Sequence, residues 1–160
     1  MILQFLLAML ATACFAVLFH APAKQIFFCA LSGGIGWICY LIFQNRGSGP
    51  VVASLIATFL LTIVSRLFAA IRKNPATLYL LIGIFTLVPG AGIYYTSYYM
   101  IMNDMEPFAA KGIETFKIAG AIAVGIIFAS SIPQSLFEKI AQAYLKIRSS
   151  IRRGDRRHRK

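Results

Sequence analysis

Charged side chains are missing from most of this sequence. Five stretches, at 2–23, 25–45, 47–65, 74–103 and 118–137, contain no Lys, Arg, Asp or Glu. Each is about as long as the roughly 20 apolar residues with which a helix crosses a bilayer. The apolar runs are continuous and do not alternate with a period of two, which excludes a transmembrane β-barrel. The sequence therefore predicts an all-α integral membrane protein and leaves little chain for a soluble domain.

Acidic residues and metal ligands are also scarce. The chain holds five Asp and Glu residues, two His and three Cys, and no carboxylate inside a predicted span is available to carry a proton. Cys14, Cys29 and Cys39 match no zinc or redox spacing and are predicted to be buried small side chains. There is no cluster of His, Asp and Glu and no nucleophile motif. We therefore expect no metal, no cofactor and no enzymatic activity.

Proline, glycine and charged residues divide the chain into a bundle of five transmembrane helices. Pro22 ends the first helix, the turn at 45–50 separates the second from the third, and Pro75 precedes the fourth. Residues 103–117 hold three of the five acids and are expected to lie along the membrane interface. The predicted spans are about 2–19, 26–43, 51–71, 76–102 and 118–137, followed by a basic cytoplasmic tail at 138–160.

Basic residues are concentrated near the C-terminus and predict the orientation. Counted on alternate sides of the spans, thirteen Lys and Arg residues fall on the C-terminal side and three on the other. Since basic residues favour the cytoplasmic side, the C-terminus is predicted inside and the N-terminus outside. The tail decides this count, because without it the two sides carry four and three. A basic tail in a soluble protein suggests nucleic-acid binding, but behind a membrane span we expect it to bind anionic lipid and no nucleic acid.

The fourth apolar run is interrupted by Leu87-Val-Pro-Gly90. A straight helix over 76–102 would be about 40 Å long, more than the roughly 30 Å of hydrocarbon requires. A break at Pro89-Gly90 leaves halves of about 20 Å each and falls near the middle of the membrane. The second half would then present free N–H groups, from Gly90 to about Ile93, to a carboxylate. The alternative is a proline kink whose loose backbone is satisfied by neighbouring helices.

Other residues near these spans allow more than one interpretation. Tyr94 lies one turn after Gly90 and offers a hydroxyl to a substrate, but the tyrosines at 94–99 are also typical of an interfacial aromatic belt. Arg66 either guides anions at the inner mouth or extends to the cytoplasmic interface. The glycines at 33–36, 120 and 125 are expected to permit close helix packing. The candidate substrate-binding residues are therefore Pro89, Gly90, Gly92, Tyr94 and Arg66.

Several short motifs resemble the threonine/serine exporter family, and more closely the small membrane subunit of its split, two-protein form. Leu87-Val-Pro-Gly90, followed by Ile93-Tyr94, is the most specific of these motifs. Thr86 departs from the family pattern, in which many members carry a further proline at that position. The resemblance covers about residues 15–137, and its other motifs are Phe19-His-Ala-Pro22, Gly33-Gly-Ile-Gly-Trp37, Lys73-Asn-Pro-Ala76 and Ser131-Ile-Pro133.

This resemblance implies a transport function. It implies export of small carboxylate-bearing metabolites, of the threonine/serine type or dicarboxylates such as succinate, across the bacterial inner membrane at the expense of the proton motive force. It also implies a larger partner subunit of the same family. The alternative is a non-transporting scaffold or assembly subunit that anchors a partner through the basic tail. The two hypotheses differ in whether the Pro89-Gly90 break is needed for flux or only for folding.

Overall fold

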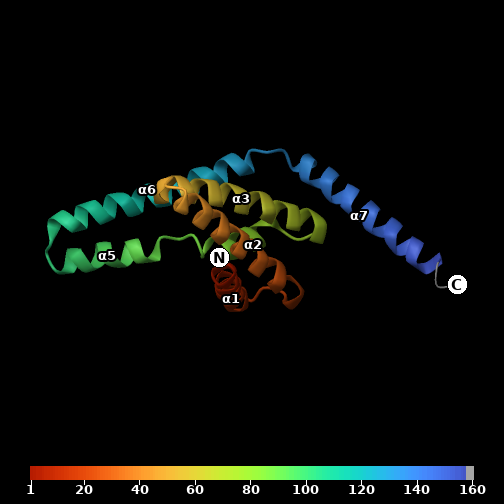
Figure 1. The fold of residues 1–160 in the computed structure, drawn as a ribbon, viewed down its shortest axis with the longest axis horizontal. Coiled ribbons are helices and arrows are strands. Elements are labelled where there is room, and N and C mark those ends of the chain that lie inside the picture. The colour runs from red at the N-terminus through yellow and green to blue at the C-terminus, as the bar shows by residue number, and fades with distance from the viewer. Residues whose placement is uncertain (158–160) are drawn as a thin grey trace.

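The protein is helical throughout the part of the chain that the structure describes. The computed structural model describes the backbone of residues 1–157 and the side chains of residues 1–146, and no strand occurs within them. The pair α5 and α6 projects from one end of a helical bundle and α7 from the other (Figure 1). The helices are α1 (Ile2–Leu18), α2 (Ala23–Asn45), α3 (Gly49–Arg72), α4 (Ala76–Ile84), α5 (Gly90–Ile101), α6 (Met105–Ser130) and α7 (Gln134–Arg157).

Three of these helices, α2, α3 and α6, are long and apolar enough to cross a membrane. Helix α1 is a shorter apolar helix of 17 residues. Helices α4 and α5 have 9 and 12 residues, and neither alone reaches the roughly 20 residues that a span requires. The prediction of an all-α, multi-pass membrane protein is confirmed, but the structure does not show five complete transmembrane helices.

The predicted helix breaks at proline are confirmed. Pro22, Pro75 and Pro89 immediately precede α2, α4 and α5. Proline lacks a backbone N–H and clashes with a preceding helical turn, so it interrupts a helix but is well placed at the start of the next one. The fourth apolar run is therefore divided into α4 and α5, which are joined by residues 85–89.

The region after α5 differs from the prediction. Residues 103–117 do not form a separate interfacial segment, because α6 is continuous from Met105 to Ser130. Pro107 interrupts nothing, since it occupies the first turn of α6, where no intrahelical N–H bond is required. The span predicted at 118–137 ends before Pro133, and the tail predicted from 138 is part of α7, which begins at Gln134. The side chains of the tail beyond Lys146 lie outside the described residues.

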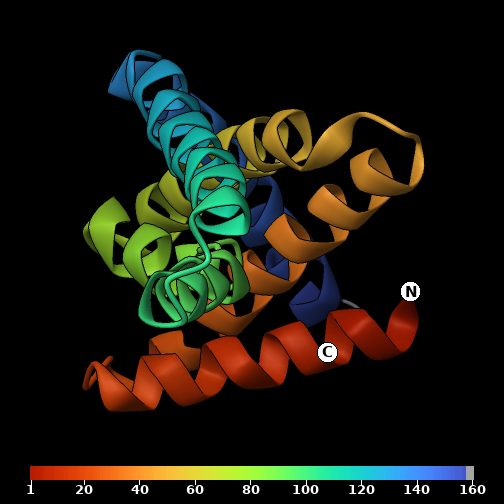
Figure 2. The same ribbon diagram turned by 90° about the vertical axis from the view of Figure 1, so that its left-hand side faces the viewer.

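Glycines permit the close helix contacts of the bundle, as predicted for most of them. A methyl group at Gly33 would collide with Thr12 of α1, and a β-carbon at Gly125 would lie 2.7 Å from the backbone oxygen of Leu55 in α3. Figure 2, which looks along the long axis, shows α1 running across the direction of α5 and α6. The packing prediction is wrong for Gly120, where an added β-carbon would meet nothing within 4 Å.

Two of the three cysteines are buried, as predicted. Cys29 and Cys39 lie in the two apolar clusters of the bundle, one on either side of the glycines of α2. Cys14 is exposed on α1, so the prediction of burial is wrong there. Its apolar neighbours are no guide to burial, because a helix that faces lipid is apolar on its exposed side as well.

Small hydroxyl residues line the buried face of α3. The hydroxyl groups of Ser54, Thr58 and Thr62 donate to backbone oxygens one turn earlier in the same helix, at 2.7 to 2.8 Å. They therefore need no partner on another helix. The buried Oγ of Ser65 is the exception, since it has no hydrogen-bond partner in the described structure.

Candidate functional site

The candidate site lies where α5 begins and faces α6. A cleft of about 430 Å³ separates the two helices and includes Pro89 in its wall. This volume falls within the range of roughly 300–1,000 Å³ that is usual for small-molecule sites. The wall is largely apolar, and the hydroxyl groups on it belong to Thr96 and Ser97 of α5 and Thr115 of α6.

The start of α5 leaves part of its backbone open to a ligand. No side chain caps the helix. The amide of Gly90 donates to the oxygen of Val88 at 2.8 Å, and the amide of Ile93 donates to the oxygen of Pro89 at 3.0 Å. The sequence suggested four free amides, from Gly90 to Ile93. In the structure only those of Ala91 and Gly92 have no hydrogen-bond acceptor. A helix N-terminus with unbonded amides favours an anion.

Gly92 brings this terminus close to α6. An added β-carbon at Gly92 would collide with the hydroxyl oxygen of Thr115, and one at Gly112 would lie 3.4 Å from Thr96. The Thr115 hydroxyl makes no hydrogen bond in the described structure, whereas that of Thr96 donates to the backbone oxygen of Gly92 at 2.8 Å. A free hydroxyl thus stands beside the free amides. Sequence reasoning missed Thr115, because its pairing with Gly92 depends on the turn that joins α5 to α6.

Gly90 and Tyr94 lie at the edge of this site. Gly90 is exposed, and an added β-carbon there would meet nothing within 4 Å. Tyr94 is 63% exposed and forms no part of the cleft wall. The tyrosines pair along two faces of α5: the rings of Tyr94 and Tyr98 stack at 6.4 Å, and so do those of Tyr95 and Tyr99.

The structure does not bring Arg66 to the cleft. Its Nη1 donates to the backbone oxygens of Ala129 and Ser130 at 2.8 and 3.2 Å, and its Nη2 donates to Oε1 of Gln134 at 3.1 Å. The guanidinium also lies 4.5 Å from the ring centre of Phe137. Thr115 and Ala129 are 14 positions apart on α6, or about 21 Å at 1.5 Å per residue. Arg66 therefore joins α3 to the C-terminal end of α6 and to α7.

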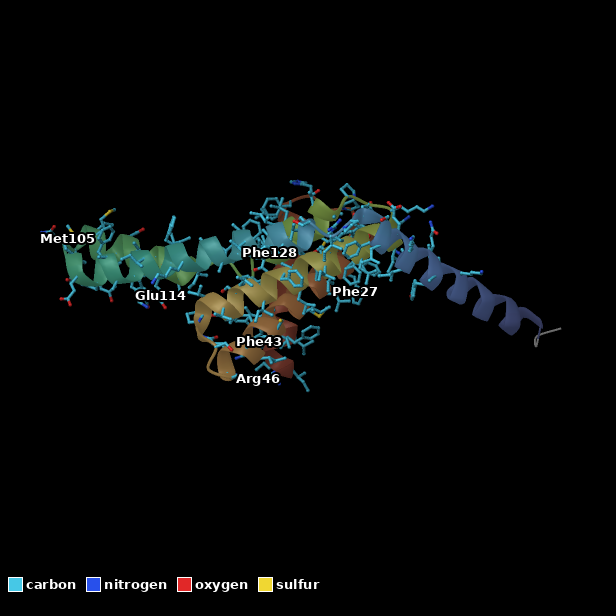
Figure 3. The ribbon with its side chains drawn as sticks, turned by 90° about the horizontal axis from the view of Figure 1, so that it is seen from above. Phe27, Phe43, Arg46, Met105, Glu114 and Phe128 are labelled. Carbon is cyan, nitrogen blue, oxygen red and sulfur yellow. The ribbon has the colours of Figure 1, made fainter. Side chains whose placement is uncertain are left out.

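The charges of α6 are relevant to how deep in the membrane the break at Pro89-Gly90 lies. Helix α5 packs against the first half of α6, which carries the ion pair of Lys111 and Glu114 at 2.8 Å. Figure 3 shows Glu114 on the part that projects from the bundle, with Met105 at its tip. Charges in the hydrocarbon core are costly, so this ion pair weighs against the mid-membrane position of the break that helix lengths alone suggest.

One protein-family model matches most of the chain, including the candidate site. The family model described as Threonine/Serine exporter, ThrE, matches residues 4–132, from the first turn of α1 to just beyond α6. No curated protein and no solved structure matches the chain. The match includes both helices of the cleft and the break between α4 and α5. The chain belongs to the threonine/serine exporter family of membrane transporters.

Proposed function

We propose that this chain is the small membrane subunit of a secondary exporter in the bacterial inner membrane. Its substrates are small carboxylate-bearing metabolites, either amino acids of the threonine/serine type or dicarboxylates such as succinate. The observation that supports this proposal most directly is the start of α5. The amides of Ala91 and Gly92 are unbonded there, and the residues on either side of the 90–92 segment, Pro89 and Ile93, line a cleft of about 430 Å³. A larger subunit of the same family completes the transporter.

The chemistry of the cleft suits one carboxylate in an otherwise apolar site. The amides of Ala91 and Gly92 donate to one carboxylate oxygen, and the Thr115 hydroxyl donates to the other. Gly90 has no side chain to obstruct the approach. Pro89 forms the apolar wall and keeps α5 separate from α4, which is what leaves these amides unbonded.

Several features support the need for a partner subunit. None of the residues of α5 is buried within this chain. The exposed large side chains of α5 include three tyrosines beside Ile93, Met100 and Ile101, whereas those of α1 are all aliphatic. We propose that the larger subunit covers these side chains of α5 and closes the cleft.

We propose that the N-terminus faces outward and that α7 lies on the cytoplasmic surface. Phe137 and Ala141 of α7 are buried, while Leu136, Ile140 and Tyr144 are apolar and exposed. This exposed row repeats every four residues and forms one face of the helix. A helix with an exposed apolar face and basic residues is suited to an anionic lipid surface.

The second candidate function is that of a scaffold that does not transport. The projecting α7 favours it, because an amphipathic surface helix can anchor an assembly without contributing to a transport path. Under this hypothesis the cleft between α5 and α6 is a packing defect at a proline break.

Efflux from proteoliposomes separates the two functions. Vesicles loaded with succinate or threonine would contain this chain, the larger subunit, or both. The exporter hypothesis expects efflux only when both are present. Full efflux with the larger subunit alone would establish the scaffold function, and efflux with this chain alone would rule out the two-subunit proposal.

A further inference from the structure

A second polar cluster lies at the end of the bundle where α2 begins, α3 ends and α4 begins. Gln25 is 8% exposed, and its Oε1 accepts hydrogen bonds from the Tyr79 hydroxyl at 2.7 Å and from Nε of Arg72 at 3.2 Å. Tyr79 is fully buried. Two donors fix the Gln25 oxygen, and its Nε2 then carries two N–H groups for which the described structure offers no acceptor.

Arg72 has more donors than the chain satisfies. Nη2 donates to the backbone oxygen of Lys24 at 3.2 Å, and the guanidinium lies 4.5 Å from the ring centre of Phe28. Of five N–H groups on a guanidinium, those on Nε and one on Nη2 are occupied. Both N–H groups on Nη1 and one N–H group on Nη2 are therefore still free to donate. They are enough for a two-point contact with an oxyanion.

Arg72 has no acidic partner in the described structure, although Glu138 of α7 lines a pocket together with the adjacent Lys73. The neighbouring Lys24 and Lys73 are exposed. Helices α2 and α4 both start here without a side-chain cap and direct the positive ends of their dipoles at the cluster, while α3 ends here with the negative end of its own dipole. Arg66 differs, because its acceptors are carbonyl oxygens at the negative, C-terminal end of α6.

We propose that Arg72 and Gln25 form an oxyanion-binding site that is separate from the α5–α6 cleft. Nη1 and Nη2 of Arg72 bind two oxygens of a carboxylate or phosphate, and Nε2 of Gln25 donates a further bond. The oxyanion is either the carboxylate of a soluble metabolite or the phosphate of a lipid headgroup. The site does not depend on the exporter proposal, because binding can be measured without transport.

Gln25→Glu tests the site with little change in shape. The new carboxylate still accepts from Tyr79 and Arg72, and it supplies the missing negative charge from within the chain. We expect it to preserve or raise the melting temperature and to abolish oxyanion binding at this site, while carboxylate binding in the α5–α6 cleft is unchanged. Arg72→Gln should abolish binding as well. Arg46→Gln, which removes an exposed arginine from the turn between α2 and α3, is the matched control and should bind as the wild type does.

The measurement uses the full-length chain in dodecyl maltoside, which contains no phosphate. Calorimetric titration and thermal unfolding would be carried out with succinate, inorganic phosphate and phosphatidylglycerol in turn. Wild-type binding of succinate or phosphate indicates a soluble ligand, and a response to phosphatidylglycerol alone indicates a lipid. Either result supports the site if Gln25→Glu weakens by about tenfold or more the component of binding that Arg72→Gln also removes. Components that both variants retain belong to the α5–α6 cleft or to the basic tail. Equal binding by wild type and Gln25→Glu, or no wild-type response to any of the three, would overturn the proposal.

Discussion

Nη1 of Arg66 donates a 2.8 Å hydrogen bond to the backbone oxygen of Ala129, across a sequence separation of 63 residues. This bond joins the last turns of α3 to the C-terminal end of α6, whose carbonyl groups carry partial negative charge. A second bond from the same guanidinium reaches Gln134 at the start of α7. Arg66 thus holds three helices together at one point. The sequence suggested that it guides anions or extends to the interface, and the structure adds a third possibility, that it stabilises the packing of these helices.

Substitution of Arg66 tests that structural role. Arg66→Gln removes the charge, and Arg66→Lys keeps it but cannot reproduce the planar set of donors. We expect both variants to lower the free energy of unfolding by about 2 kcal/mol, since bonds from a charged donor are lost and helix-end carbonyls are left without partners. Thermal unfolding in detergent would show it. Wild-type stability together with a loss of export that Arg66→Lys restores would support an anion guide instead.

Gly92→Ala tests the contact between α5 and α6. The added methyl group would collide with the Thr115 hydroxyl, and overpacking of this kind costs roughly 1–3 kcal/mol. We expect faster amide hydrogen exchange in α5 and a lower melting temperature. The double variant Gly92→Ala/Thr115→Ala removes the obstructing oxygen and should recover most of the stability. No recovery in the double variant would mean that the two residues are not in contact.

Ser65→Ala should stabilise the protein or leave its stability unchanged. The Ser65 hydroxyl is buried without a hydrogen-bond partner, and an unsatisfied buried polar group costs about 1–3 kcal/mol. Ser54→Ala is the matched control, because that hydroxyl donates to the oxygen of Pro50 at 2.7 Å, and its removal should be neutral or mildly destabilising. A clear loss of melting temperature in Ser65→Ala alone would contradict this and indicate that the Ser65 hydroxyl is hydrogen-bonded within the chain.

Truncation after Lys146 tests the tail. The removed segment carries seven of the sixteen Lys and Arg residues, so binding to vesicles that contain phosphatidylglycerol should weaken and become less sensitive to salt. The buried residues of α7, Phe137 and Ala141, are retained. Export per inserted molecule should therefore stay close to that of the full-length chain. A loss of export at normal membrane abundance would show that the tail belongs to the transport machinery.

Much of the helical framework could be predicted from the sequence, because proline and glycine act locally. Pro22, Pro75 and Pro89 mark helix starts through their own covalent geometry. The continuity of α6 could not be predicted in the same way. Its first half contains Pro107 and several charges, and it is helical because α5 packs along it.

The candidate sites depend on contacts that sequence spacing does not reveal. Gly92 and Thr115 meet through the turn between α5 and α6, and Tyr79 reaches Gln25 across 54 residues. The sequence therefore suggested a helix terminus as the candidate substrate site but not the residue that faces it on α6. It also directed attention to Arg66, whose donors the chain itself occupies, rather than to Arg72, whose donors it leaves partly free.

Export by Gly90→Val is the most direct test of the claim that the start of α5 binds the substrate carboxylate. An added β-carbon meets nothing within 4 Å at Gly90 or at Gly120 of α6, so both valine variants should fold, and Gly120→Val serves as the control. The measurement is efflux of succinate or threonine from cells that also express the larger subunit, normalised to the amount of inserted protein. We expect Gly90→Val to abolish export and Gly120→Val to retain it. Wild-type export by Gly90→Val at wild-type abundance would contradict the claim and leave the break at Pro89 as a packing kink.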